Sequence, residues 1–306
     1  MQTGVAPTGD LTLDGDEFAE FLDVIYRDYH HDFRHYAAAS LRRRVSYAMR
    51  RLRCRSLSEL RTWLTASSGR MTDLLQYLTV SVTEMFRDPA YFLAVREHVM
   101  PVLQNTVSPK IWVAGCSTGE EAWSMAILLR EAGLLERSLV YATDINPLAL
   151  IQAERGIFST EKIRLYTENY QRAGGTTAFS DYYLAAYGNA VFDRSLRRHI
   201  VFAEHSLATD HVFSEMNFVS CRNVLIYFNS HLQEHAMSLF VDSLSPRGFI
   251  GLGSRESLSF SGHASTFDPF LKAARIYRKK DEFQRYPDHV SEAEYDGDSG
   301  ENIVGR

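Results

Sequence analysis

The fold is decided between residues 110 and 146, where the sequence is KIWVAGCSTGEEAWSMAILLREAGLLERSLVYATDIN. A short apolar run at 111–114 precedes a loop of small residues, and a helical pattern begins at Glu120. A second apolar run at 138–143 ends at Asp144. A strand, a glycine-containing loop, a helix and a second strand that ends at an acid form half of a nucleotide-binding unit. The stretch therefore predicts a site for a nucleotide-like ligand.

Strand and helix patterns continue to alternate as far as residue 253. This alternation predicts an α/β fold with a doubly wound, mostly parallel sheet, which is the Rossmann-like arrangement. Ligands of such sheets bind outside the carboxyl ends of the strands. The segments that directly follow predicted strands should share that edge, and they are residues 115–119, Asp144, Ser206 and residues 221–223.

Length and composition limit the class of protein. The chain has 306 residues, 45% of them hydrophobic, and a net charge of −5, which suits two globular domains without a global basic surface for nucleic acid. The three cysteines, Cys54, Cys116 and Cys221, are far apart, so neither a disulfide framework nor a metal site is expected. We find no signal peptide and no apolar run that could cross a bilayer, and we expect a cytoplasmic protein.

Residues 1–78 are predicted to form an all-helical domain. Apolar residues recur at helical spacing in four segments, two of which begin with capping-box pairs, Asp14 with Glu17 and Ser56 with Glu59. Residues 79–88 are a predicted linker that contributes to the ligand site, and Pro89 begins the next helix.

The second domain is predicted at 89–285. Within it, aromatic and β-branched residues around Gly188 and Asn189 predict a small antiparallel β-subdomain at about 178–198. Residues 286–306 are polar and acidic, and we expect them to be disordered.

The second predicted helix is unusually basic. Seven arginines and no acid lie between positions 42 and 55, namely Arg42, Arg43, Arg44, Arg50, Arg51, Arg53 and Arg55. They could be a solvated face whose side-chain stems cover apolar neighbours. Like charges four residues apart destabilise a helix, however, and an acidic partner would offset that cost. We therefore assign Arg42, Arg43, Arg44, Arg50 and Arg51 to substrate docking.

Two acids, Glu120 and Glu121, occupy the first turn of the helix after the glycine loop. A helix start normally attracts anions, but two carboxylates there repel a pyrophosphate. A cationic cofactor fits better, and S-adenosylmethionine carries both a sulfonium and an ammonium group. The alternative is structural, with Ser117 and Glu120 forming a capping box.

Asp144 could bind the two ribose hydroxyls of a nucleoside, or it could cap the helix that Pro147 begins. Asn146 is better placed to cap that helix, so we favour the ligand role for Asp144. Other candidates have structural alternatives: a salt bridge or cap for Thr83 and Arg87, core packing for Tyr227, and a turn for Asn223.

Four separated motifs resemble the CheR family of chemotaxis receptor methyltransferases. They are VSVTEMFRDP at 80–89, AGCSTGEEAWSMAILL at 114–129, YATDIN at 141–146 and CRNVLIYFN at 221–229. The resemblance covers roughly residues 16–280 and includes the basic helical domain. It implies a class I methyltransferase fold with a small β-subdomain. It also implies methyl transfer from S-adenosylmethionine to glutamate side chains of chemoreceptors, with S-adenosylhomocysteine as the product.

The resemblance also implies roles for individual residues. Thr83 and Arg87 would lie against the methionine end of the cofactor, and Arg87 and Tyr227 would be catalytic by orienting the substrate carboxylate. The implied cofactor contacts are Ser81, Thr83, Arg87, Glu120, Asp144, Ser206, Leu207, Arg222 and Asn223. Ser81 and Ser206 are departures, because an asparagine is common in the family at each position. The hairpin turn at Gly188 is shorter than in members that tether to a receptor's C-terminal peptide, so no tethering is expected.

The implied partner is the cytoplasmic helical region of chemoreceptors, approached by a monomer that needs no metal, nucleic acid or membrane insertion. Two other functions remain open. The fold could serve as a non-catalytic module that binds the cofactor or a nucleotide, or it could methylate RNA or small molecules.

Overall fold

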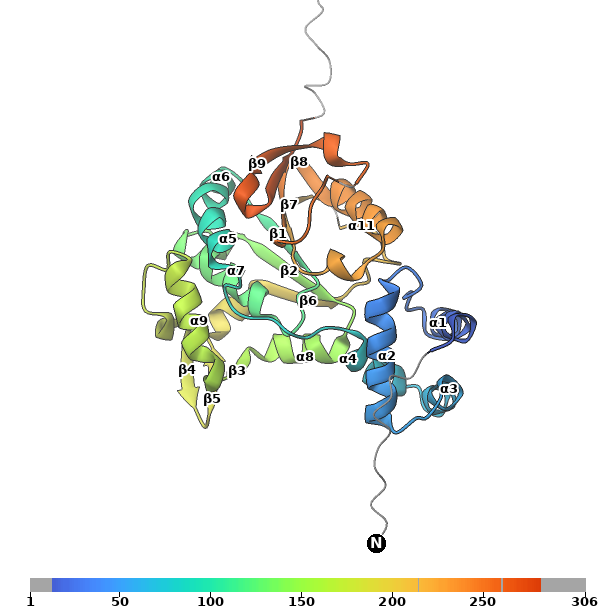
Figure 1. Ribbon diagram of the computed structural model, residues 1–306. Coiled ribbons are helices and arrows are strands. Elements are labelled where there is room, and N and C mark those ends of the chain that lie inside the picture. Colours follow the sequence, from blue (N-terminus) through green and yellow to red (C-terminus); the bar gives the residue numbers. More distant parts are fainter. Residues whose placement is uncertain (1–12, 214, 260, 282–306) are drawn as a thin grey trace, which may run out of the picture.

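The computed structural model describes residues 13–213, 215–259 and 261–281 (Figure 1). The predicted disorder of the tail at 286–306 concerns residues outside this range. The described chain forms a helical domain that packs against one side of a larger α/β domain (Figure 1). A division after residue 78 stays a proposal, which the separate hydrophobic cores of the two parts support.

Four helices build the N-terminal part, close to where the sequence predicts them: α1 Gly15–Tyr29, α2 Ala38–Leu52, α3 Leu57–Thr65 and α4 Arg70–Leu78. Ser56 caps α3 by accepting a hydrogen bond from Glu59 N at 3.1 Å, as the capping box predicts. Asp14 caps α1 through Asp16 N at 3.4 Å. Each helix buries one apolar stripe in a shared core, so tertiary packing holds these short helices together.

A seven-stranded sheet forms the α/β domain, with strand order β6-β2-β1-β7-β8-β10-β9. The parallel strands are β1 Lys110–Ala114, β2 Leu139–Asp144, β6 Ile200–Glu204, β7 Met216–Cys221 and β8 Leu244–Leu252. Two antiparallel strands complete one edge, β9 Phe267–Leu271 and β10 Ile276–Lys279. The prediction of a doubly wound, mostly parallel sheet is therefore confirmed.

Helices cover both faces of this sheet. Successive residues of β1 alternate between two cores: Ile111 and Val113 enter one, and Trp112 and Ala114 enter the other. The first core also holds α5 Pro89–Ala94, the π-helical turn Val95–Val99, α6 Met100–Leu103 and α7 Glu120–Glu131, while the second holds α11 Ser230–Ser243. Strand order reverses between β1 and β7, which is where doubly wound sheets bind ligands.

The small β-subdomain lies on the opposite side of the molecule from the helical domain (Figure 1). Strands β4 Tyr183–Ala186 and β5 Asn189–Phe192 form the predicted hairpin, with Tyr187 and Gly188 as the two-residue turn. Asn189, which the sequence placed in the turn, is the first residue of β5. A third strand, β3 Ile157–Ser159, pairs with β5 and was not predicted.

Three further helices follow β2: α8 Pro147–Arg155, α9 Thr160–Arg172 and α10 Arg194–Arg197. Helix α9 was not predicted, because its buried face consists of Tyr166, Asn169 and Tyr170 rather than an aliphatic stripe. Strand β8 begins at Leu244. Pairing with β7 continues through an irregularity in register, so the Pro246-Arg247-Gly248 segment belongs to the strand.

Close packing between α5 and β8 provides a test of the fold. A Cβ atom added to Gly251 would lie 2.1 Å from the hydroxyl of the buried Tyr91. We predict that Gly251→Ala lowers the free energy of unfolding by about 1–3 kcal/mol, the usual cost of overpacking. Urea denaturation measures this loss. The control is Gly15→Ala, where an added Cβ meets nothing within 4 Å and the change should stay below about 0.5 kcal/mol. Equal stabilities would contradict the packing.

Candidate functional site

A cleft opens between the helical domain and the carboxyl ends of β1, β2 and β7. Residues of both domains line its larger part. The α/β domain contributes Gly115, Asp144, Ile145, His205, Leu207, Asn223, Val224, Tyr227 and Phe228. The helical domain and the linker contribute Tyr36, Ala37, Ser40, Leu41, Arg44, Leu78, Thr79 and Val80.

The two domains are joined at this cleft by backbone contacts. Ala37 N donates to Tyr227 O at 2.7 Å, and Asn229 N donates to His35 O at 2.9 Å. The rings of Tyr36 and Phe228 pack edge to face with centroids 5.0 Å apart. The helical domain therefore forms one side of the cleft and holds Tyr227 in place, a role that no local sequence pattern around Tyr36 indicates.

Asp144 ends β2 and lines the cleft. Its carboxylate accepts from Ser117 N at 2.8 Å and from Asn146 N at 3.0 Å, so it also fixes the loop after β1. Burial raises the pKa of Asp144 above its ordinary value, and the backbone N–H groups act in the opposite direction. Asn146 caps α8 through Leu148 N and Ala149 N, which confirms that Asp144 is not the cap.

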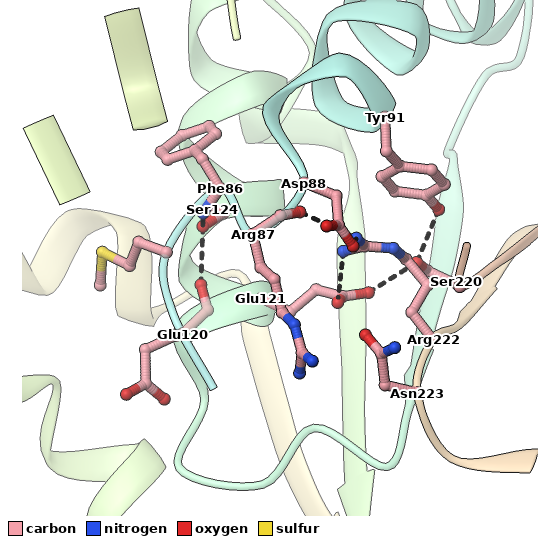
Figure 2. Close-up of polar contacts among 12 residues, drawn as sticks. Phe86, Arg87, Asp88, Tyr91, Glu120, Glu121, Ser124, Ser220, Arg222 and Asn223 are labelled. Atoms are coloured by element: carbon pink, nitrogen blue, oxygen red, sulfur yellow. Dashed lines mark hydrogen bonds and ion pairs between the residues drawn. The ribbon is translucent and has the colours of Figure 1, made fainter. Parts of the chain in front are cut away.

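The two acids at the start of α7 point in different directions (Figure 2). Glu120 is fully buried and accepts from Thr118 Oγ1 at 2.6 Å and from Tyr166 Oη at 3.1 Å; Lys162 of α9 lies 3.4 Å away. It is absent from the residues that line the cleft. Glu121 lines a branch of the cleft instead. The alternative capping box does not form either, because Gly119 caps α7 without a side-chain bond.

Arg222 is buried beneath this branch, with its side chain 1% exposed (Figure 2). Its guanidinium donates to Glu121 at 3.0 Å, to Asp88 at 2.7 Å and to the Arg87 carbonyl at 2.8 Å. It also stacks on Tyr91, with 4.1 Å to the ring centroid. Burial alone would lower the pKa of Arg222, but Glu121 and the other partners outweigh it and the pKa is raised. Arg222 thus joins the linker, α7 and β7.

Thr83, Arg87 and Tyr227 line the same branch as Glu121. The Arg87 guanidinium donates to Val82 O at 3.3 Å and forms no ion pair within the described residues. Ser81, assigned to the cofactor from the sequence, is exposed and does not line the cleft. The structure therefore places Arg87 and Tyr227, the proposed catalytic pair, in the same branch of the cleft. Within the described residues, the Arg87 guanidinium has no carboxylate partner.

The segment after β6 contributes His205 and Leu207 to the cleft, but not Ser206. Ser206 N donates to Asp210 at 2.8 Å, and Ser206 Oγ accepts from Ala208 N at 3.3 Å, so this residue shapes the turn. His205 was not predicted to line the cleft, although it directly precedes Ser206, which was expected at the same edge of the sheet.

The arginines of the basic helix α2 fall into three groups according to their contacts. Arg44 lines the cleft, donates to Thr79 O at 2.9 Å and lies 5.7 Å from the Tyr227 ring centroid. Arg42 donates to Leu13 O at 2.5 Å and covers the Phe18 ring, which is a structural role. Arg43, Arg50 and Arg51 are exposed.

Buried polar atoms without a hydrogen-bond partner gather at the cleft. Within the described part of the chain they include Ser117 Oγ, Asn223 Oδ1, His205 Nδ1 and Arg44 Nε. Each of these residues lines the cleft or its branch. Buried polar groups are normally satisfied, so these atoms fit a polar ligand such as S-adenosylmethionine, with its ribose, adenine and amino-acid end.

Residues 13–213, 215–259 and 261–281 contain no group of three or more His, Cys, Asp or Glu side chains that could hold a metal ion. Within the same ranges, no helix is long and apolar enough to span a membrane.

We predict that Asp144→Asn weakens binding of S-adenosylhomocysteine by at least about tenfold. The new NH₂ group would face a backbone N–H donor, and the carboxylate available to the ribose would be lost. Isothermal titration calorimetry measures the affinity. Arg172→Ala, at an exposed arginine of α9 outside the cleft, is the control and should bind as the wild type does. Equal affinities for Asp144→Asn and the wild type would contradict the site.

The chain is similar to known families and proteins. Residues 16–79 match the family model "CheR methyltransferase, all-alpha domain", and residues 81–271 match "CheR methyltransferase, SAM binding domain". A Pseudomonas putida protein named "Putative methyltransferase Cher3" is 54% identical over 86% of this chain and 96% of its own length. "Chemotaxis protein methyltransferase 2" of Pseudomonas aeruginosa is 29% identical over 72% of this chain and 79% of its own.

The two family models together account for nearly all of the described residues, and one of them is a binding domain for S-adenosylmethionine. The cofactor is therefore S-adenosylmethionine, and the chain belongs to the CheR methyltransferase family.

Proposed function

We propose that this protein transfers a methyl group from S-adenosylmethionine to glutamate side chains of chemoreceptors and forms methyl esters there. One observation carries the proposal. Of the two guanidinium groups at the branch of the cleft, Arg222 is neutralised by Glu121 and Asp88, whereas Arg87 has no carboxylate partner among the described residues. Arg87 is therefore available to pair with a carboxylate of the substrate.

A glutamate acceptor suits the branch of the cleft that Arg87 and Tyr227 line, because the carboxylate that lines this branch, Glu121, is paired with Arg222. Its carboxylate is already ionised at neutral pH and can attack without losing a proton. The cofactor supplies the methyl group on a sulfonium, which is a good leaving group. Arg87 would hold one carboxylate oxygen, and the Tyr227 hydroxyl would orient the group for attack by the other. Catalysis then depends on positioning, which the interdomain contacts to Tyr227 provide.

Thr83 and Arg87 would contact the methionine end of the cofactor, and Asp144 would bind its ribose. Leu207 and Asn223 line the cleft, which supports the cofactor contacts that the family resemblance implies for them. Glu121, rather than Glu120, is the acid that lines the branch, and we assign it to the cationic end of the cofactor. Arg222 contributes indirectly, because it holds Glu121 and the Arg87 backbone.

The exposed arginines Arg43, Arg50 and Arg51 would dock the acidic surface of a receptor's cytoplasmic helices. They lie on the helix that also carries Arg44 into the cleft, so a docked receptor would reach the site directly. The two-residue turn at Tyr187 and Gly188 supports action without a tethered C-terminal peptide. We place this reaction in the cytoplasm, carried out by a monomer without nucleic acid.

We predict that Arg87→Ala lowers the methylation rate of chemoreceptor cytoplasmic fragments by at least about 100-fold, because the acceptor loses its positioning group. Arg87→Lys should recover only part of the rate, since a lysine lacks the planar fork. Transfer of alkali-labile tritium from labelled cofactor measures both rates. Arg172→Ala, at an exposed arginine of α9, is the control. Unchanged transfer by Arg87→Ala would remove Arg87 from the mechanism.

Reversing the charge of the exposed face provides a separate test. The combined change Arg43→Glu, Arg50→Glu and Arg51→Glu should raise the KM for the receptor fragment by at least about tenfold and leave binding of S-adenosylhomocysteine unchanged. Added salt should raise the KM of the wild type in the same direction. Arg155→Glu, Arg164→Glu and Arg172→Glu combined, at exposed arginines of α8 and α9, control for the same change in net charge. A KM equal to that of the wild type would exclude docking through this face.

A further inference from the structure

A buried carboxylate lies behind the loop that carries Asn223 and Tyr227. Glu256 follows β8 and is 4% exposed. One of its oxygens accepts from Asn223 N at 2.9 Å and from Gly253 N at 2.7 Å. The other accepts from Val224 N at 2.9 Å and from Ile226 N at 3.4 Å. Within the described residues, these four backbone N–H groups are the donors to the Glu256 carboxylate. Glu256 itself does not line the cleft.

Three of the four donors belong to residues 223–226: Asn223 and Val224 lie between β7 and the turn Leu225–Tyr227, and Ile226 lies within that turn. This segment is irregular, and its N–H groups have no strand or helix partner of their own. Asn223 adopts a left-handed conformation with a φ of 59°, which is unusual for a residue other than glycine. A carboxylate that binds several successive N–H groups is a strong local constraint, because each bond is charge-assisted. Glu256 thus restrains the backbone at Asn223 and directly before Tyr227.

The close approach of the two loops agrees with this role. A Cβ atom added to Gly253 would lie 2.6 Å from Glu256 Oε2 and 2.9 Å from Asn223 N. The backbone after β8 therefore has to come within hydrogen-bonding distance of the loop after β7, and Gly253 leaves the space for it.

We propose that Glu256 is a positioning residue, whose carboxylate holds the loop 223–227 in the conformation that binds the cofactor and presents Tyr227. Both oxygens are fully used as acceptors, so glutamine cannot replace glutamate. Its NH₂ group would face two N–H donors in a buried place. The role concerns cofactor binding, and it does not depend on which side chain accepts the methyl group.

The test compares two buried glutamates. Glu131 is also nearly buried, forms an ion pair with Arg96 at 2.6 Å and accepts from Tyr182 Oη at 3.0 Å, but it does not line the cleft. Both Glu256→Gln and Glu131→Gln should lower the melting temperature. Only Glu256→Gln should weaken binding of S-adenosylhomocysteine, by at least about tenfold, because a loop displaced by a fraction of an ångström misplaces its contacts. Wild-type affinity in folded Glu256→Gln would overturn the proposal.

If Glu256→Gln does not fold, hydrogen exchange of the wild type without cofactor tests whether Glu256 holds the loop 223–227. The amides of Asn223, Val224, Ile226 and Gly253 should be protected to the same degree as amides of β7. Exchange as fast as that of the exposed linker residues Ser81 and Val82 would overturn the proposal, since the carboxylate would then not hold the loop.

Discussion

The ion-pair network of Arg222 is the interaction on which the site depends. Its guanidinium is nearly inaccessible to solvent and lies between Glu121 at the start of α7 and Asp88 at the start of α5. Removing one partner of such a buried pair typically costs about 3–5 kcal/mol, because an uncompensated charge remains. The network also bonds to the Arg87 carbonyl, so the linker between the two domains is attached to the sheet beside the cleft.

This network divides the charges of the cleft into two kinds. Arg222 is satisfied by protein carboxylates and serves the structure, whereas Arg87 and Arg44 carry guanidinium groups that form no ion pair within the described residues. Glu121 and Glu256 are likewise fixed by protein donors, but Glu121 lines the cleft and Glu256 stands behind it. The same residue types therefore have different roles, and burial and hydrogen-bond partners distinguish them.

The sequence predicted the sheet, the helical domain and the cleft edge because each depends on a local pattern. Apolar runs, capping residues and the acid after β2 all lie within a few residues of the element they define. A local pattern does not distinguish the roles of Glu120 and Glu121. Either acid fits the pattern at the start of α7, but only packing against Tyr166 of α9 determines which one turns away from the cleft. The roles of Tyr36, Arg44 and Glu256 arise from contacts between segments distant in sequence, which no local pattern indicates.

The central proposal is that the methyl acceptor is an ionised glutamate of a chemoreceptor, whose carboxylate pairs with the Arg87 guanidinium. Tandem mass spectrometry of receptor cytoplasmic fragments, incubated with the protein and S-adenosylmethionine, tests it most directly. The account predicts the mass of one added methyl group on glutamate side chains, removed by mild alkali as expected for an ester. Binding of the cofactor with no modified glutamate on any receptor fragment would contradict it, and so would methylation confined to RNA or small molecules.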